Sequence, residues 1–382
     1  MLYRKMKSTD DDVSILGFGC MRFPKNDDGK IDREKSERML KYAIDNGINY
    51  FDTAWPYHGE ESEFFVGDFL QKTNKRKKIF LATKLPSWKI EKYEDFDYYL
   101  NKQLERLKTE YIDYYLLHAL DKERWDKLKS NNVFKFLEKL EESDKVRAIG
   151  FSFHDKYEIF EEIIDSYNWD FCQIQYNYMD IDYQAGYRGL KLANKKGIDL
   201  IIMEPLRGGM LTGEIPEDVQ KIYKKSDKEY SAAEWALRWI WNHPEVSLAL
   251  SGMSTLEHVK ENIEIAKNSE AENMSGKDIS IIEEVREKYL NRTMVNCTSC
   301  EYCMPCPNDV KIPACFRLYN NAYIYKDINR MRKFYNGMLD DKNKASQCIE
   351  CGECLEKCPQ NINIIEELKN VTELFEIEGS KK

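Results

Sequence analysis

The chain has 382 residues, of which 42% are hydrophobic and 33% are charged, so it can bury a sizeable core and lacks the composition of a disordered protein. Its net charge is −9 and no long basic run occurs, which argues against nucleic acid as a partner. The first residues lack the apolar core of a signal peptide, and no window approaches the ~18 apolar residues of a membrane-spanning helix. We therefore expect a soluble, cytoplasmic protein with no membrane partner.

Short apolar runs alternate with longer amphipathic segments between residues 13 and 270. The runs are nearly continuously apolar, as is typical of parallel strands buried on both faces. They cover residues 13–19, 48–54, 78–84, 111–118, 146–152, 171–177, 199–205 and 247–253. Residues 32–47 show the pattern between them, with apolar side chains at helical spacing and a glycine at the end.

Eight strands that each precede a helix predict a (β/α)8 TIM barrel. A doubly wound sheet is the competing fold, but GFGCMR at residues 17–22 lacks the third glycine of its G-x-G-x-x-G signal. We assign residues 1–270 to the barrel and residues 271–290 to a helical connector. Residues 291–382 are expected to form a small cysteine-rich domain, α+β or helical, that ends in a helix.

Polar side chains with complementary chemistry follow three successive strands. Asp52 and Tyr57 follow the second strand, Lys84 ends the third and His118 ends the fourth. Active sites of parallel barrels lie where the strands end, so we expect these four side chains to converge.

The four side chains suit the reduction of a carbonyl group, which needs a proton donor for the developing alkoxide. Tyrosine titrates near 10, and we expect the Lys84 ammonium to lower the pKa of Tyr57. Asp52 would keep Lys84 charged and in place. His118 would direct the substrate oxygen by hydrogen bonding.

Nine of the 11 cysteines lie in two groups and one insert between residues 297 and 358. The first group has two residues between successive members: Cys297, Cys300, Cys303 and Cys306. The second group has the Cys-x2-Cys-x2-Cys-x3-Cys-Pro spacing: Cys348, Cys351, Cys354 and Cys358. This is the bacterial ferredoxin spacing, and in a reducing cytoplasm such clusters indicate metal ligation rather than disulfides. Zinc is the alternative to iron–sulfur clusters at this site, since thiolate ligands suit both.

Several segments of the barrel region resemble the aldo-keto reductases. They are YFDTAWPYHGEES, LATK, YYLLH, IGFSFH, QIQYN and MEPLRGG, within residues 13–270. The resemblance implies that Tyr57 is the acid, supported by Asp52, Lys84 and His118, and that a nicotinamide cofactor binds at the rim.

The same resemblance implies a set of nucleotide contacts. Ser152 and Gln173 would hold the carboxamide, and Leu206 would lie near the pyrophosphate. The segment SGMSTLEHVKEN, residues 251–262, would bring Glu261 and Asn262 to the adenine. The remaining cofactor-binding residues would be Met21, Ser254 and His258.

The sequence departs from the family pattern at three positions near the expected nucleotide. Phe153 replaces the usual asparagine, Met203 replaces a tyrosine that stacks on the nicotinamide, and His258 replaces the arginine that grips the 2′-phosphate. NADH and NADPH therefore remain alternatives, and a rim with a weaker nicotinamide grip could hold FMN.

The cysteine region resembles the bacterial ferredoxin domain, and the whole chain resembles the aldo-keto reductases that carry such a domain at the carboxyl end. In two-cluster ferredoxins the fourth cysteine of each group ligates the other cluster. One 4Fe-4S cluster would be held by Cys297, Cys300, Cys303 and Cys358. The other would be held by Cys348, Cys351, Cys354 and Cys306. The first group is one residue short before Cys306, which leaves Cys315 as an alternative ligand.

The leading hypothesis is an oxidoreductase that couples carbonyl and nicotinamide chemistry at the barrel rim to one-electron transfer through two 4Fe-4S clusters. One alternative is an NAD(P)H-dependent carbonyl reductase whose clusters are structural or redox-sensing. Another is a regulatory or binding subunit that keeps the barrel as a scaffold. Residues 311–344 hold eight basic and three acidic side chains, which predicts a docking surface for an acidic ferredoxin or flavodoxin.

Overall fold

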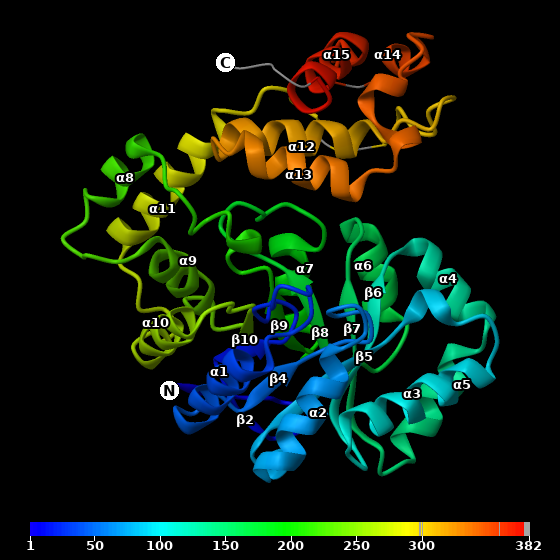
Figure 1. Cartoon of the computed structure of the whole chain (residues 1–382), viewed down its shortest axis with the longest axis vertical. Helices are drawn as coiled ribbons and strands as arrows, with labels where there is room; N and C mark the ends of the chain where they lie inside the picture. The colour runs from blue at the N-terminus through cyan, green and yellow to red at the C-terminus, as the bar shows by residue number, and fades with distance from the viewer. Residues whose placement is uncertain (298, 300, 359, 378–382) are drawn as a thin grey trace. The chain divides into compact units, whose positions relative to one another are not determined.

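The computed structural model describes residues 1–297, 299, 301–358 and 360–377. The chain forms two compact units (Figure 1). The first comprises Met1–Gly213 and Tyr230–Ile279, and the second comprises Glu214–Glu229 and Ser280–Lys382. One segment between two barrel elements therefore belongs to the second unit.

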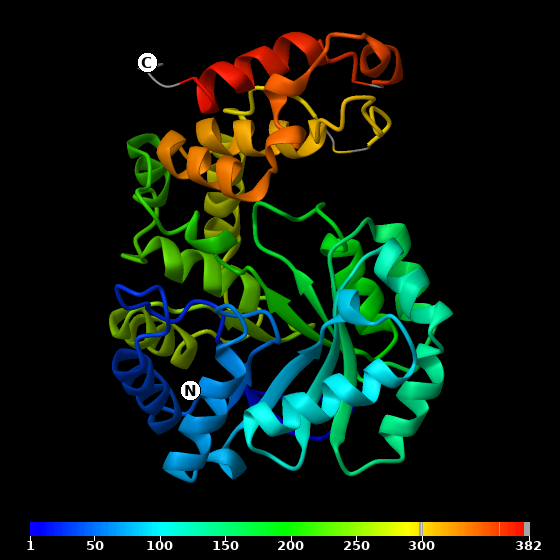
Figure 2. The same cartoon turned by 45° about the vertical axis from the view of Figure 1, so that its right-hand side comes forward.

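The first unit is a closed parallel barrel of eight strands, with helices around it (Figure 2). In chain order the strands are β3 (Leu16–Gly19), β4 (Tyr50–Asp52), β5 (Phe80–Leu85), β6 (Ile112–Leu120), β7 (Val146–Phe153), β8 (Phe171–Gln175), β9 (Asp199–Met203) and β10 (Val246–Ser251). Each pairs with the next in the sequence, and β10 pairs with β3 to close the barrel. The predicted TIM barrel is confirmed.

The helices of this unit cover the outside of the strands. They are α1 (Arg33–Asp45), α2 (Ser62–Thr73), α3 (Glu94–Leu107), α4 (Lys122–Ser130), α5 (Val133–Glu141), α6 (Tyr157–Asp165), α7 (Gly186–Lys195), α9 (Ala232–Trp241) and α10 (Leu256–Lys267). α1 shows how the sequence sets them. The Asp32 side chain caps its first turn by accepting a hydrogen bond from Lys35 N, and Met39, Leu40 and Ala43 form its buried face.

A hairpin precedes the barrel and was not expected from the sequence. β1 (Tyr3–Lys5) pairs with β2 (Asp12–Ser14) in antiparallel fashion, so the predicted first strand divides between β2 and β3. The turn carries Met6 into the barrel core, where it packs with Tyr114 and Phe171 among others. Asp199, at the start of β9, accepts hydrogen bonds from the backbone of the same turn. The hairpin thus fills the end of the barrel where the strands begin.

In the part of the second unit that the structure describes, the regular elements are helices, and the cysteine loops between them are irregular. Its helices are α8 (Glu217–Tyr223), the end of α11 (Gly276–Leu290), α12 (Ile312–Ile324), α13 (Ile328–Met338), α14 (Glu353–Lys357) and α15 (Ile364–Phe375). α12, α13 and α15 pack together around buried Phe316, Tyr335 and Phe375, and the last two rings lie 4.9 Å apart. α15 is the expected terminal helix.

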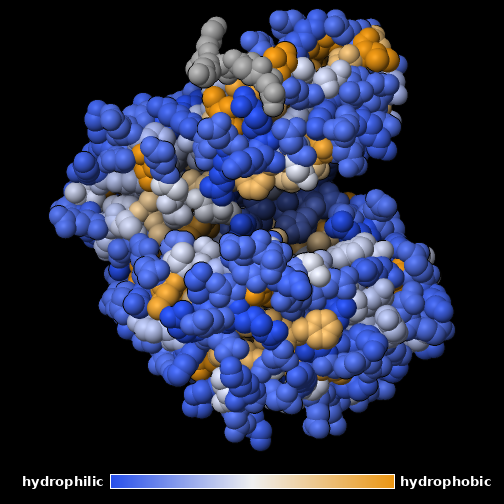
Figure 3. Space-filling model, viewed as in Figure 1, coloured by the Kyte–Doolittle hydropathy of each residue, from blue (hydrophilic) through white to orange (hydrophobic). Residues whose placement is uncertain are grey.

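Hydrophilic side chains cover most of the face shown in Figure 3. Among the described residues, no helix has both the length and the apolar character needed to cross a membrane.

Candidate active site and cysteine loops

The four side chains predicted to converge lie together where β4, β5 and β6 end. The Lys84 ammonium lies 2.5 Å from Asp52 Oδ1, 2.9 Å from Thr53 O and 3.4 Å from the Tyr57 hydroxyl. An ammonium has three N–H donors, so these three acceptors satisfy all of them. Because the Tyr57 oxygen accepts from Lys84, its own proton can be donated elsewhere.

The His118 ring lies edge-on to the Tyr57 ring, with 6.1 Å between ring centroids and an interplanar angle of 79°. Trp88 covers the imidazole at 5.3 Å. Within the described residues, His118 Nδ1 is buried and has no hydrogen-bond partner. Such an atom is costly to leave unpaired, so it offers a site for a polar atom of a bound molecule.

The surroundings set the protonation of this site. Burial alone would lower the pKa of Lys84, but attraction to Asp52 and Tyr57 outweighs it and raises the pKa, so the ammonium persists. Burial, aided by the charge of Lys84, holds the pKa of His118 well below its usual range and keeps the imidazole neutral. The sequence predicted a lowered pKa for Tyr57, and this was wrong. Burial raises it more than Lys84 lowers it.

Ser152 and Gln173 are direct partners in the pairing of β7 with β8. Both are buried. Gln173 Nε2 donates to Asp52 Oδ2 at 3.3 Å, and Ser152 Oγ accepts from Ala119 N at 2.7 Å. The two residues expected at the carboxamide therefore lie beside the Lys84 site. Phe153 packs against Phe160.

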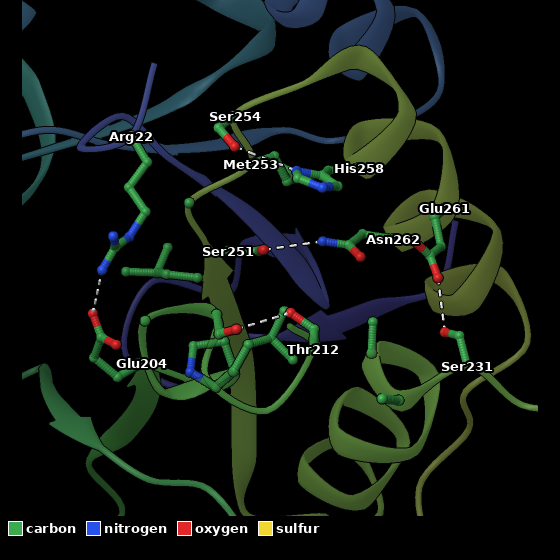
Figure 4. A pocket seen from close by; sticks show the side chains of 18 residues that line it. Arg22, Glu204, Thr212, Ser231, Ser251, Met253, Ser254, His258, Glu261 and Asn262 are labelled. Carbon is green, nitrogen blue, oxygen red and sulfur yellow. Dashed lines mark hydrogen bonds and ion pairs between the residues drawn. The ribbon is translucent and has the colours of Figure 1, made fainter. Parts of the chain in front are cut away.

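A pocket of about 310 Å³ lies beside the ends of β9 and β10; we call it the rim pocket (Figure 4). Five of the predicted cofactor residues line it: Leu206, Ser254, His258, Glu261 and Asn262. Met21 does not line it and is 53% exposed. Sequence reasoning missed Arg22, Glu204, Thr212 and Ser231, which also line it.

Two contacts at the pocket hold three of these side chains: Arg22, Glu204 and Ser231. Arg22 Nη2 lies 3.3 Å from Glu204 Oε1, and Ser231 Oγ donates to Glu261 Oε1 at 2.7 Å (Figure 4). Gly252 makes room for the arginine, since a Cβ atom there would lie 2.7 Å from Arg22 Cδ. The glycine after the β10 run was the one local signal of this close approach.

The loop after β9 forms one wall of the rim pocket in an uncommon backbone conformation. Glu204 has φ +55° and Arg207 has φ +48°, values that cost energy for residues other than glycine. The buried carboxylate of Asp180 holds this loop, because Arg207 Nη2 lies 3.2 Å from it. Asn177 supports the arrangement by donating to Asp180 Oδ2 at 2.9 Å and to Glu204 O at 3.1 Å.

Three cysteines of the second group and two of the first line one small cavity of about 20 Å³. The cysteines in its wall are Cys303, Cys306, Cys348, Cys351 and Cys354. Ile312, Ile349 and Leu368 provide apolar surface there. Burial raises the pKa of Cys354, and the neighbouring thiols of Cys348, Cys351 and Cys306 raise it further. Among the described residues, no three such side chains are arranged to hold a metal ion. The chemistry of the donors, thiols with an apolar wall, suits an iron–sulfur cluster.

Cys306 and Cys315 are in different environments. Cys306 lines this cavity. Cys315 is a fully buried residue of α12; its sulfur lies 3.9 Å from Asn343 O, and burial raises its pKa to about 12. Cys297 and Cys358 are partly exposed and do not line the cavity. Cys300 lies outside the described residues.

Comparison with known families agrees with both units. Residues 15–287 match the model of the Aldo/keto reductase family, and residues 296–362 match that of a 4Fe-4S dicluster domain. The chain therefore belongs to the aldo/keto reductase family. It is an oxidoreductase whose barrel is followed by a helical iron–sulfur domain.

Individual relatives cover the barrel. The uncharacterized oxidoreductase YqkF of Bacillus subtilis is 27% identical over 296 residues, 70% of this chain and 91% of that protein. L-Galactose dehydrogenase of Arabidopsis thaliana is 25% identical over 312 residues, 76% and 96% of the two chains. Two solved aldo-keto reductases share the fold, each covering 75% of this chain and 96% of its own. That of Bacillus halodurans in its holo form has a TM-score of 0.63 at 24% identity. That of Klebsiella pneumoniae with NADPH has 0.60 at 21%.

Proposed function

We propose that this oxidoreductase interconverts a small carbonyl compound and its alcohol with NADP(H) at the barrel rim, and that two 4Fe-4S clusters in the second unit exchange single electrons with an outside carrier. The main support for this proposal is the buried Lys84 ammonium, which donates hydrogen bonds to both Asp52 and the Tyr57 hydroxyl. A binding scaffold has no need for a buried charge in contact with a phenol, because burying a charge is costly.

The side chains divide the proton chemistry between them. A bound nicotinamide supplies or takes up the hydride. Tyr57 donates its proton to the carbonyl oxygen as negative charge develops, and Lys84 stabilises the phenolate that remains. Asp52 holds Lys84 in place. His118, neutral and unpaired at Nδ1, can donate a hydrogen bond to the same oxygen and orient it.

The rim pocket is the proposed site of the nucleotide, with Ser152 and Gln173 toward the carboxamide. Leu206, Ser254, His258, Glu261 and Asn262 would contact the rest, and Arg22 adds a cation that suits phosphate. The Klebsiella relatives hold NADP or NADPH, which favours NADP(H) over NADH. FMN has no support from the residues or from these relatives.

We keep the crossed ligand assignment for the clusters. Cys306 shares a cavity with Cys348, Cys351 and Cys354, as that assignment requires. The other cluster would take Cys297, Cys300, Cys303 and Cys358. Each cluster passes one electron, whereas a nicotinamide passes two as hydride. Electron exchange between the clusters and the barrel would therefore require a one-to-two-electron converter, such as a flavin, or a substrate that tolerates a radical.

The carrier would be an acidic ferredoxin or flavodoxin in the cytoplasm. Lys333 is exposed on α13 beside Asn336 and Gly337. Arg332, in contrast, donates to Leu374 O at 2.6 Å, so part of its role is structural. Charge reversal at Lys333 should therefore slow electron delivery at low salt.

The central test uses anaerobically purified, iron-loaded protein. NADPH-dependent reduction of short aldehydes is measured together with reduction of the clusters by a viologen dye. Cys351 and Cys354 belong to the same proposed cluster, so we expect Cys351→Ser and Cys354→Ser to lower electron exchange with the dye while the barrel stays folded. Exchange equal to that of the wild type in these variants would refute one-electron transfer through this cluster. Unfolding of the protein on iron removal would indicate that the clusters are structural. NADPH binding without turnover would indicate a non-catalytic binding subunit.

A further inference from the structure

The segment 214–229 leaves the barrel unit between two residues of the rim pocket. Thr212 precedes it and Ser231 follows it, and both line the pocket. The segment itself belongs to the unit that carries the cysteine loops. Whatever holds the segment therefore acts on both sides of one pocket wall through the covalent chain.

Ion pairs within the second unit hold this segment. Asp218, in the first turn of α8, lies 2.6 Å from Arg292 Nη2 and 3.5 Å from Lys288 Nζ. The hydrogen bond from Arg292 is the main reason that the pKa of Asp218 falls to about 2. Lys225, just after α8, forms an ion pair with Glu284 on α11.

Arg292 is anchored at the base of the first cysteine loop. Its Nη1 donates to Ile324 O, at the end of α12, at 2.8 Å. Its side chain is only 14% exposed. The backbone that follows is held by Asn320, whose Oδ1 accepts from Met294 N at 3.1 Å and from Val295 N at 2.9 Å. Cys297 comes two residues later.

Hydrogen bonds also hold Ser231, which follows the segment on the side of the rim pocket. Ser231 caps α9 by accepting from Glu234 N at 3.1 Å, and it donates to Glu261 Oε1 at 2.7 Å. A shift of the segment would therefore move the hydroxyl that orients Glu261 in the pocket.

We propose that Asp218 and Arg292 are positioning residues for the rim pocket. Their ion pair fastens the segment between Thr212 and Ser231 to the base of the first cysteine loop, so that nucleotide affinity depends on the intact iron–sulfur unit. The inference rests on the proposed function in one respect, namely that the rim pocket binds NADP(H).

The test measures NADPH binding to the full, iron-loaded chain by titration calorimetry. Asp218→Asn should raise the Kd for NADPH about fivefold or more, the lower end of ordinary coupling between sites, while kcat at saturating NADPH changes little. Asp218→Glu, which keeps the charge, should restore most of the affinity. Asp341→Asn removes a comparable ion pair with Lys344 elsewhere in this unit and should leave the Kd unchanged.

Two further readouts separate positioning from general damage. In a double-mutant cycle, Asp218→Asn with Arg292→Gln should weaken binding no more than Arg292→Gln alone. Because coupling is reciprocal, NADPH should slow hydrogen exchange in residues 214–229 of the wild type but not of Asp218→Asn.

The outcomes are distinguishable. If the wild type does not bind NADPH, the proposed function fails and this inference with it. If the wild type binds and Asp218→Asn binds equally well, the inference alone is overturned. A loss in Asp218→Glu or Asp341→Asn as large as that in Asp218→Asn would also overturn it, since the effect would not then belong to this ion pair.

Discussion

Lys84 and Asp52 form an ion pair of 2.5 Å in which the two side chains are 1% and 4% exposed. Removing one partner of such a pair leaves an uncompensated buried charge, whereas replacing both with apolar groups is often tolerated. Stability and catalysis at this site can therefore be separated by experiment.

Lys84→Met should lower the free energy of unfolding by about 3–5 kcal/mol and reduce kcat for carbonyl reduction by roughly 10²–10⁴-fold. The double variant Lys84→Met with Asp52→Leu should regain much of the stability but none of the activity. Thermal unfolding and steady-state kinetics measure the two effects, with Lys102→Met on the exposed face of α3 as control. Recovered activity in the double variant would contradict the assigned role of the ammonium.

The rate of carbonyl reduction should not fall as the pH rises through the ordinary assay range. The Tyr57 pKa is raised by burial, so the phenol keeps its proton below that value and the rate falls only above about pH 10, the usual tyrosine range. Tyr57→Phe should be inactive at every pH, and Tyr98→Phe, an exposed tyrosine, should behave as wild type. A fall in kcat centred near pH 7–8 would mean that Lys84 dominates after all.

Asp180→Asn should weaken nucleotide binding without preventing chemistry. Losing the carboxylate frees Arg207 and the loop with positive φ angles that forms the pocket wall. We expect KM for NADPH to rise about tenfold, in line with a loss of about 1.4 kcal/mol, with kcat nearly constant. Asp182, two residues after Asp180, is exposed, and Asp182→Asn serves as the control. An equal fall in kcat and kcat/KM would instead assign Asp180 to the chemical step.

Cys306→Ser should remove one cluster, and Cys315→Ser should not. Cys306 lines the cavity with Cys348 and Cys351, whereas Cys315 is a buried residue of α12 whose thiol has a pKa of about 12. A ligand must be a thiolate. Iron and sulfide content should fall to about half in Cys306→Ser, and the EPR spectrum of the reduced protein should lose the signature of two coupled clusters. The reverse result would make Cys315 the ligand.

Features that depend on periodicity and strand order could be predicted from the sequence. Continuous apolar runs indicated the barrel, and the position of Lys84 and His118 at successive strand ends indicated their convergence. Features that depend on distant pairing could not. Met6 enters the barrel core through a hairpin that leaves no local pattern. Arg22 meets Glu204 from far along the chain, and Gly252 beside Arg22 is the one local trace of that approach.

The predicted direction of the Tyr57 pKa shift was wrong for a physical reason. That direction depends on how much water burial removes from the phenol, and a motif does not encode burial. The contacts of the segment 214–229 with Glu284 and Arg292 likewise join residues far apart in the sequence, and contacts at that separation leave no local pattern.

The helical core of the second unit contains its own apolar interior, with Phe316, Tyr335 and Phe375 buried among α12, α13 and α15. These side chains take their packing partners from the three helices themselves. The first cysteine group precedes α12, and the second lies between α13 and α15. Both groups are therefore attached to one shared core, and a substitution that loosens its packing should disturb both at once.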